Sequence, residues 1–231
     1  MALQRNMYRV GRLTAKPNYK TSAIGLTGIQ PLHLDSKKDS FIYIPKSYNH
    51  NTPACLAMML HGAGGNAEHG LSLLRNYADD KNIILLAPAS QAYTWDIIAE
   101  NTFGRDMILI DQGLAFVFDR FAINPLQIAI GGFSDGASYA LCVGLSNGDL
   151  FTHIIAFSPG FFYTVQNQGK PNVFISHGVR DKVLPIHLCS RRIVHQLKSK
   201  NIKVHYHEFD GEHEIPAPIS QAAIDGFTKD Q

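Results

Sequence analysis

The chain has 231 residues, 45% of them hydrophobic, a length for which one globular domain is the default expectation. Its formal net charge is only +2, and the sequence contains no long basic run, which argues against a nucleic-acid-binding protein. Nowhere do about eighteen apolar residues follow one another, so we expect no transmembrane helix and no stable membrane insertion.

The cysteines and the N-terminal residues bear on the cellular setting. The three cysteines, Cys55, Cys142 and Cys189, are odd in number and scattered, which argues against a disulfide framework. Residues 1–10 lack the apolar core of a signal peptide. We therefore predict a reducing, cytoplasmic setting and small-molecule partners, while the oligomeric state stays open.

The first half of the chain predicts a βαβ crossover. Residues 1–40 are mixed in character, and we expect an N-terminal extension or a peripheral strand or two. A strand at 41–44 is stopped by Pro45, and the apolar run 55–60 is typical of a strand buried on both faces. A helix at 68–80 and a second buried strand at 83–87 then complete the crossover.

The second half continues the same alternation after a long irregular connection at 89–104, a length that is usually functional or mobile. Strands alternating with helices at this spacing predict a parallel, doubly wound α/β sheet in a single domain. We expect strands at 127–131, 152–157, 173–176 and 203–209, and helices at 105–121, 135–147, 185–200 and 218–228.

The segment 128–141 reads IAIGGFSDGASYAL, in which an apolar strand ends in glycines and a helix begins after a serine. Gly132, Ser134 and Gly136 form the pattern G-x-S-x-G, which in this setting is typical of a nucleophile elbow. The glycines let the strand and helix backbones approach closely around a strained serine. The pentapeptide alone is weak evidence, so the prediction of Ser134 as nucleophile depends on residues at other strand ends.

Acyl transfer by a serine needs a base to accept its proton and a carboxylate to orient that base. Asp181 lies 47 residues after Ser134, in the turn that follows the strand 173–176. His213 lies 32 residues further on, in the loop after the strand 203–209. We predict Asp181 as the acid and His213 as the base, since the order serine, aspartate, histidine is that of α/β-hydrolases.

Two backbone N–H groups are predicted to bind the developing oxyanion. One is the N–H of Asp135 at the start of the helix after the serine, and the other belongs to the glycine-rich turn 61–65, from Ala63. His61 in that turn is expected to hold the loop by a hydrogen bond, because the base should follow the acid in the chain.

Four segments, LHGAGGN, GFSDGAS, HGVRDKVLP and DGEHEIP, resemble the oxyanion loop, elbow, acid turn and histidine loop of α/β-hydrolase serine esterases. The most similar groups are the phospholipase/carboxylesterase group, which includes acyl-protein thioesterases, and feruloyl-esterase and polyhydroxybutyrate-depolymerase-like proteins. The matching motifs span residues 55 to 219. The resemblance implies the α/β-hydrolase fold and assigns the same roles to Ser134, Asp181, His213, Ala63 and Asp135.

Asp135 departs from the family pattern. The resembling families more often have glutamine, methionine or asparagine after the nucleophile. The backbone donor of Asp135 is unaffected, but its carboxylate changes the field around an oxyanion. We expect an effect on rate and pH optimum rather than a change of role.

Other readings of the acidic residue stay open at this stage. Asp181 can be a surface aspartate paired with Arg180 or Lys182, and such pairs contribute little to stability. Asp210 is the nearest rival acid, although its position three residues before His213 favours a turn former.

The remaining histidines also have alternative roles. His177 precedes a glycine at a strand end and is expected to stabilise that turn. His205 and His207 share one face of a strand and suggest a metal site with His213, but no cysteine or paired carboxylate supports it. We therefore expect no metal and no organic cofactor.

Aromatic residues follow two of the strands. Trp95, in the loop 89–104, and Phe161 and Phe162, after the strand 152–157, are candidates for a substrate pocket, and core packing explains them equally well. The chain between the elbow helix and the acid turn is too short for a lipase-type helical lid, so an open site is expected.

These features together predict a serine carboxylesterase that hydrolyses short-chain or small esters through an acyl-enzyme. One alternative is an acyl-protein thioesterase or lysophospholipase acting on long acyl chains. Another, from a different class, is a catalytically silent α/β-hydrolase used as a binding module, which the apparently complete set of Ser134, Asp181 and His213 disfavours.

Overall fold

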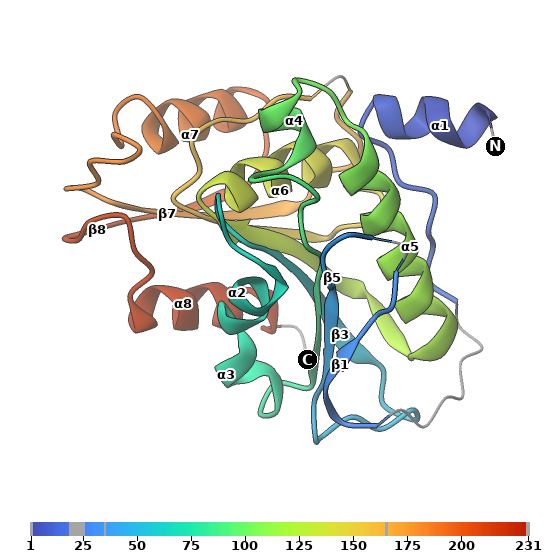
Figure 1. Ribbon diagram of the computed structural model, residues 1–231. Coiled ribbons are helices and arrows are strands. Elements are labelled where there is room, and N and C mark those ends of the chain that lie inside the picture. The colour runs from blue at the N-terminus through green and yellow to red at the C-terminus, as the bar shows by residue number, and fades with distance from the viewer. Residues whose placement is uncertain (1, 19–25, 35, 165, 230–231) are drawn as a thin grey trace.

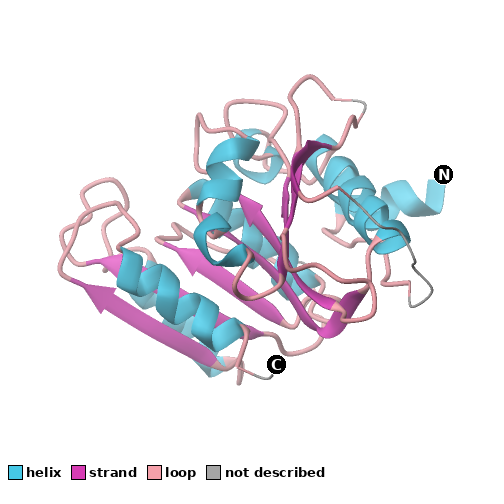
Figure 2. Ribbon diagram, turned by 90° about the horizontal axis from the view of Figure 1, so that it is seen from below, coloured by secondary structure: helices cyan, strands magenta, loops and turns pink. Residues whose placement is uncertain are grey.

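The computed structural model describes residues 2–18, 26–34, 36–164 and 166–229 (Figure 1). They contain an eight-stranded sheet with the order β1-β2-β4-β3-β5-β6-β7-β8. β2 runs antiparallel to both neighbours, and the strands from β4 to β8 are mutually parallel (Figure 2). The strands are β1 (Gly28–Pro31), β2 (Phe41–Ile44), β3 (Ala54–Leu60), β4 (Ile83–Ala87), β5 (Ile123–Phe133), β6 (His153–Phe157), β7 (Asn172–Gly178) and β8 (Val204–Phe209).

Hydrophobic cores cover both faces of the sheet, because the central strands β3 and β4 are apolar at every position. Successive residues of β3 alternate between them: Leu56 and Met58 join one cluster, and Ala57 and Met59 join the other. Such alternation is the two-residue period of a strand buried on both faces. Since all eight strands lie in this one sheet, we propose that the chain folds as one domain.

Helices pack on both faces of the sheet (Figure 1). The first core cluster includes residues of α5, α6 and α7, and the second includes residues of α2, α3 and α8. No helix within the described residues is long and apolar enough to cross a membrane. The helices are α1 (Ala2–Arg9), α2 (Ala67–Ser72), α3 (Arg75–Ala78), α4 (Asp96–Ala99), α5 (Arg105–Arg120), α6 (Asp135–Ser146), α7 (Ser190–Ser199) and α8 (Ala217–Phe227).

The predicted sheet is confirmed, and three predicted elements need correction. The helix expected at 68–80 is two helices, α2 and α3, because the backbone leaves the helical region at the fully buried Leu74. The irregular connection 89–104 contains the short helix α4. The helix expected from residue 185 begins at Ser190, after a turn in which the Leu188 and Cys189 N–H groups donate to the Pro185 carbonyl.

The N-terminal segment differs most from expectation. Of the one or two peripheral strands expected within 1–40, the described residues contain β1, and they also contain the helix α1, which was not predicted. Residues 1, 19–25 and 35 lie outside the described part. The buried Asp111 of α5 fastens this segment, because its carboxylate accepts hydrogen bonds from Tyr8, Thr14 and the Ala15 N–H.

Candidate active site

The turn between β5 and α6 holds Ser134 in a conformation that non-glycine residues rarely adopt, with φ 57° and ψ −120°. The flanking glycines are sterically required. A Cβ on Gly132 would lie 2.6 Å from the Leu60 carbonyl oxygen, and one on Gly136 would collide with the same atom. The sequence pattern thus corresponds to a real close approach of strand, turn and helix, and it turns the Ser134 side chain toward the loops at the carboxyl ends of the strands.

Three side chains distant in sequence meet at this turn. Nε2 of His213 lies 2.9 Å from Oγ of Ser134, and Nδ1 of His213 lies 2.5 Å from Oδ2 of Asp181. The Asp181 side chain is fully buried, whereas the His213 side chain is 16% exposed. The imidazole can therefore accept the serine proton at one nitrogen while the carboxylate holds the other.

The structure distinguishes between the candidate acids. The Arg180 guanidinium pairs with Asp210, so it does not pair with Asp181. The Asp210 side chain is 80% exposed and makes its ion pair on the surface, away from the imidazole of His213. Asp181 is thus the carboxylate that reaches the histidine.

Asp181 stays ionised although it is buried. Burial acts to raise the pKa of its carboxyl, but hydrogen bonds from the Leu184 N–H, from His213 and from the Val183 N–H outweigh burial and bring the pKa below its usual value. A carboxylate that accepts several N–H bonds is stabilised in its charged form. Its negative charge is therefore available to the imidazole at neutral pH.

The turn after β3 lies directly against the serine, since a Cβ on Gly62 would lie 3.5 Å from the Cβ of Ser134. The two N–H groups predicted as oxyanion donors, those of Ala63 and Asp135, donate to no other residue in the described part of the chain. The Ala63 side of this turn is exposed. Both donors are therefore free to bind an oxygen atom of a ligand.

His61 holds this turn, as the sequence predicts. Its Nδ1 donates to the Gly62 carbonyl at 2.7 Å, and its Nε2 accepts from the Ser90 N–H at 3.1 Å. Burial lowers the pKa of His61, which keeps the ring neutral and suits this pattern of one donor and one acceptor. The loop 89–95 supports the turn again through the Tyr93 carbonyl, which accepts from the Gly64 N–H at 2.7 Å.

Trp95 does not line an open pocket, contrary to the prediction. Its side chain is fully buried, its ring stacks on Tyr139 with centroids 5.1 Å apart, and its indole N–H donates to the His61 carbonyl at 2.9 Å. A buried indole needs such an acceptor. Trp95 therefore supports the turn 61–65 from the core.

Phe161 and Phe162 do line a surface depression of about 690 Å³, together with residues of α7. Phe161 is 38% exposed, and Phe162 packs partly against the core. Their preceding loop contacts the elbow helix, because the Gly160 N–H donates to Oγ of Ser138 at 2.9 Å. A role for both phenylalanines in substrate binding stays a proposal.

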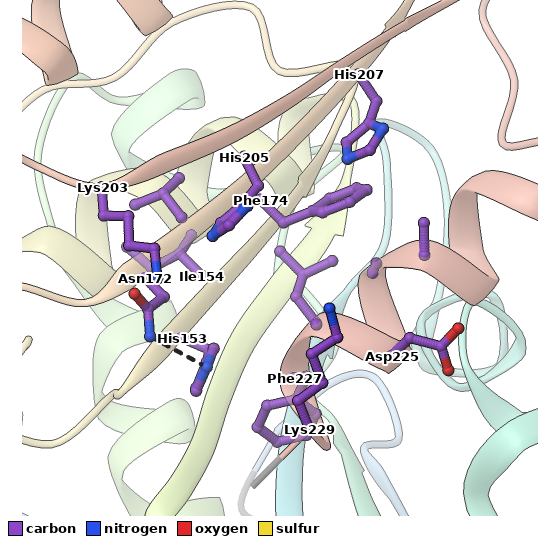
Figure 3. Close-up of a pocket in the computed structure, with 15 residues that line it drawn as sticks. His153, Ile154, Asn172, Phe174, Lys203, His205, His207, Asp225, Phe227 and Lys229 are labelled. Carbon is purple, nitrogen blue, oxygen red and sulfur yellow. Dashed lines mark hydrogen bonds between the residues drawn. The ribbon is translucent and has the colours of Figure 1, made fainter.

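The three histidines of the alternative metal site do not converge. His205 and His207 lie in a groove of about 610 Å³ between β6, β7, β8 and α8, where His207 stacks on Phe174 (Figure 3). His213 instead pairs with Asp181 and Ser134. The described residues contain no group of three side chains that could hold a metal ion.

This α8 groove is separate from the elbow, since it includes the first residues of β6 and β7, whereas Ser134 follows the last residue of β5. Its positive side chains, Lys203 and Lys229, are exposed (Figure 3). Solvent screens such exposed charges, so the two lysines alone do not mark the groove as a binding site.

One contact at the site was not predicted from the sequence. Oγ of Thr94 donates to Oδ2 of Asp135 at 2.5 Å, across 41 residues of sequence. Thr94 is almost buried, at 8% exposure, and it belongs to the long connection 89–104. The only available signal was the unusual length of that connection.

The comparisons with known proteins agree with this geometry. A model of the phospholipase/carboxylesterase family matches residues 99–228, more than half of the 231 residues. The chain belongs to this family. The match contains the elbow, the acid turn and the histidine loop.

A curated relative of this family member is the probable feruloyl esterase C of Aspergillus flavus, 27% identical over 167 residues. That alignment covers 69% of this chain and 60% of the relative, so the chain spans less than two thirds of the relative's length. Two solved structures share the fold. Esterase PE8 has a TM-score of 0.66 at 20% identity, covering 81% of this chain and 96% of the other. The ferulic acid esterase of Anaeromyces mucronatus has a TM-score of 0.63 at 16% identity, covering 94% and 98%. The family member therefore has the α/β-hydrolase fold.

Proposed function

We propose that this protein is a serine carboxylesterase that hydrolyses small or short-chain carboxylic esters. The contact of His213 with both Ser134 and Asp181 carries the proposal, because this order of contacts is what acyl transfer by a serine requires. Membership of the phospholipase/carboxylesterase family and the similarity to esterases support it.

In the proposed mechanism, His213 accepts the proton of Ser134 as the serine oxygen attacks the ester carbonyl. The N–H groups of Ala63 and Asp135 bind the tetrahedral oxyanion. Protonated His213, held by Asp181, then gives its proton to the leaving alcohol. The same histidine later activates a water molecule that hydrolyses the acyl-enzyme and frees Ser134.

We also propose that the protein works in a reducing compartment. Cys55, Cys142 and Cys189 are all reduced and buried. Burial raises the pKa of the Cys142 thiol to about 12, so this thiol stays protonated and unreactive. The free state of the three thiols is what supports the proposal of a reducing compartment such as the cytoplasm.

The decisive variant is Ser134→Ala. We expect it to lose at least about 1000-fold in kcat for p-nitrophenyl acetate, as expected for removal of a serine nucleophile, and to lose labelling by a fluorophosphonate. Ser146→Ala is the matched control, because Ser146 is a buried serine at the far end of α6, the helix that follows Ser134, and its hydroxyl donates only to the Cys142 carbonyl. Full labelling of folded Ser134→Ala would overturn the proposal.

A further inference from the structure

The carboxylate of Asp181 contacts a second histidine, to which the proposed mechanism gives no task. Nε2 of His177 lies 3.1 Å from Oδ2 of Asp181, the same oxygen that accepts from His213. His177 is the penultimate residue of β7, and its side chain is fully buried. It is thus a buried titratable group in direct contact with the acid.

The neighbours of His177 fix where its proton lies. Nε2 is 2.7 Å from the Leu184 carbonyl oxygen, which can only accept a hydrogen bond, so Nε2 carries a hydrogen. Nδ1 is 2.6 Å from Oγ of Ser190, whose hydroxyl can donate. Burial lowers the pKa of His177, which favours the neutral ring. The result is a neutral imidazole whose Nε2–H donates to the Leu184 carbonyl, while Nε2 also lies 3.1 Å from Oδ2 of Asp181.

Both carboxylate oxygens of the acid are in contact with nitrogen atoms. Oδ1 of Asp181 accepts from the N–H groups of Val183 and Leu184, at 2.9 and 2.8 Å. Oδ2 faces the ring nitrogens of His213 and His177. Three N–H donors, those of Val183, Leu184 and His213, hold the carboxylate, and the Nε2 edge of His177 lies against its remaining side.

The charge of His177 affects the proposed mechanism, because His177 and the base His213 face the same oxygen, Oδ2 of Asp181. A protonated His177 would place a second positive charge on Asp181 just when His213 becomes positive. The other charged group that interacts with His177 is Glu208 of β8, which pairs with Arg191. Asp181, His213 and Glu208 are thus the titratable groups that interact electrostatically with His177.

We propose that His177 is a positioning residue, whose neutral Nε2–H group holds Oδ2 of Asp181 in line with Nδ1 of His213. This inference rests on the proposed esterase function. It predicts that a side chain with a donor at the Nε2 position preserves activity and that a side chain without one does not.

Three substitutions of His177 distinguish the effect of the N–H donor from the effect of losing the imidazole ring. His177→Gln places an amide N–H near the position of Nε2, whereas His177→Asn places it near Nδ1, and His177→Leu has no donor. We expect kcat for p-nitrophenyl acetate to fall about 10- to 100-fold in the Asn and Leu variants, as for other residues that orient a catalytic group, and by less than about threefold in the Gln variant. KM should stay unchanged, because His177 lies behind Asp181.

The rates are divided by the number of sites that a fluorophosphonate labels to completion, which removes any loss of folded protein. The acid limb of kcat/KM should move to higher pH in His177→Leu, because Asp181 then interacts more strongly with protonated His213, and stay in place in His177→Gln. An unchanged kcat per labelled site in the Leu variant would overturn the proposal. So would an equal loss in the Gln and Leu variants, which is the mark of a merely structural role.

A measurement on the wild-type protein covers the case in which the Asn and Leu variants do not fold. The ¹⁵N chemical shifts of His177 should show a neutral ring protonated at Nε2 at neutral pH. A positively charged ring, or one protonated at Nδ1, would refute the inference. Retained activity of Ser134→Ala would instead refute the esterase function, so the two failures are distinguishable.

Discussion

Asp135 combines two opposing effects in one residue. Its backbone N–H is a proposed oxyanion donor, while its carboxylate is fixed nearby by the hydrogen bond from Thr94. A second carboxylate oxygen, Oδ1, has no hydrogen-bond partner among the described residues. A fixed negative charge close to a developing negative charge raises the barrier, by up to about 4 kcal/mol for two charges in contact at an effective dielectric constant of about 20.

Asp135→Asn should therefore accelerate the hydrolysis of neutral esters. We expect kcat/KM to rise about three- to tenfold at low ionic strength, less than the contact value because Asp135 is partly exposed, and to rise less in high salt. The same variant should lose any preference for acetylcholine over its uncharged isostere 3,3-dimethylbutyl acetate. A slower Asn variant, or an unchanged substrate ratio, would show that this charge does not act on the reaction. Thr94→Val, which keeps the carboxylate and removes its donor, is the control.

At the scale of elements, two buried carboxylates organise the long connection 89–104. Asp96 accepts from the N–H groups of Gly104 and Asp106 and from the Tyr139 hydroxyl. Asp106 accepts from the N–H groups of Gln91 and Asp96. The connection is thereby fixed onto α5 and α6, and it presents Thr94 and Tyr93 to the elbow and the oxyanion turn.

This arrangement should make stability depend on pH. Burial, and next the nearby Asp96 carboxylate, raise the pKa of Asp106 to about 6 from a usual value near 4. The folded state then binds more protons than the unfolded state between about pH 4 and 6. The contribution of Asp106 to the free energy of unfolding is therefore fully present below pH 4 and is lost as the pH rises through 6. The loss amounts to about 2 to 3 kcal/mol at about 1.4 kcal/mol per pKa unit.

Asp106→Asn isolates this contribution, because the amide resembles the protonated acid. The free energy of unfolding of each protein is measured in urea at several pH values. The variant's value minus the wild-type value should increase by about 2 to 3 kcal/mol as the pH is raised from 4 to 7. Comparison of the two proteins at each pH cancels the opposite slope from acids such as Asp181, whose pKa is lowered. A constant difference across that range would contradict the prediction.

At the scale of the whole molecule, no long insertion follows β6 or β7. The chain from β6 to β7 crosses residues 158–171, and that from β7 to α7 crosses residues 179–189. In the described residues of these segments, neither contains a helix long enough to cover Ser134 and exclude solvent, as the lid of a lipase does. We therefore expect the proposed active site to be open above the elbow.

An open site predicts no interfacial activation. The rate on p-nitrophenyl butyrate and on tributyrin should rise smoothly with concentration through the solubility limit, because no lid has to open at a lipid surface. A sharp rise in rate at the limit would show that some segment closes over the site. A lipase with a helical lid, assayed beside it, provides the positive control.

Sequence periodicity was enough to predict the strands at the centre of the sheet, because β3 and β4 are buried on both faces and therefore apolar throughout. It failed for α1 and for the break between α2 and α3, where tertiary contacts such as the burial of Leu74 decide the backbone. The residues of the proposed site could be located because each follows a strand. The partner Thr94 could not be assigned, since a hydrogen bond across 41 residues leaves no local pattern. For His177 the sequence predicted only a role in the turn after its strand, and its contact with Asp181 follows from the packing of that turn.

The place of Trp95 gives the protein an optical reporter. It is the only tryptophan in the chain, and its ring lies between His61, at 4.9 Å, and Tyr139, in a fully buried site. Its fluorescence emission therefore reports on the packing around the turn 61–65 and on no other part of the molecule. A shift of that emission toward longer wavelength in mild denaturant, ahead of the loss of helical circular dichroism, would mean that the catalytic end of the sheet opens before the rest of the molecule unfolds.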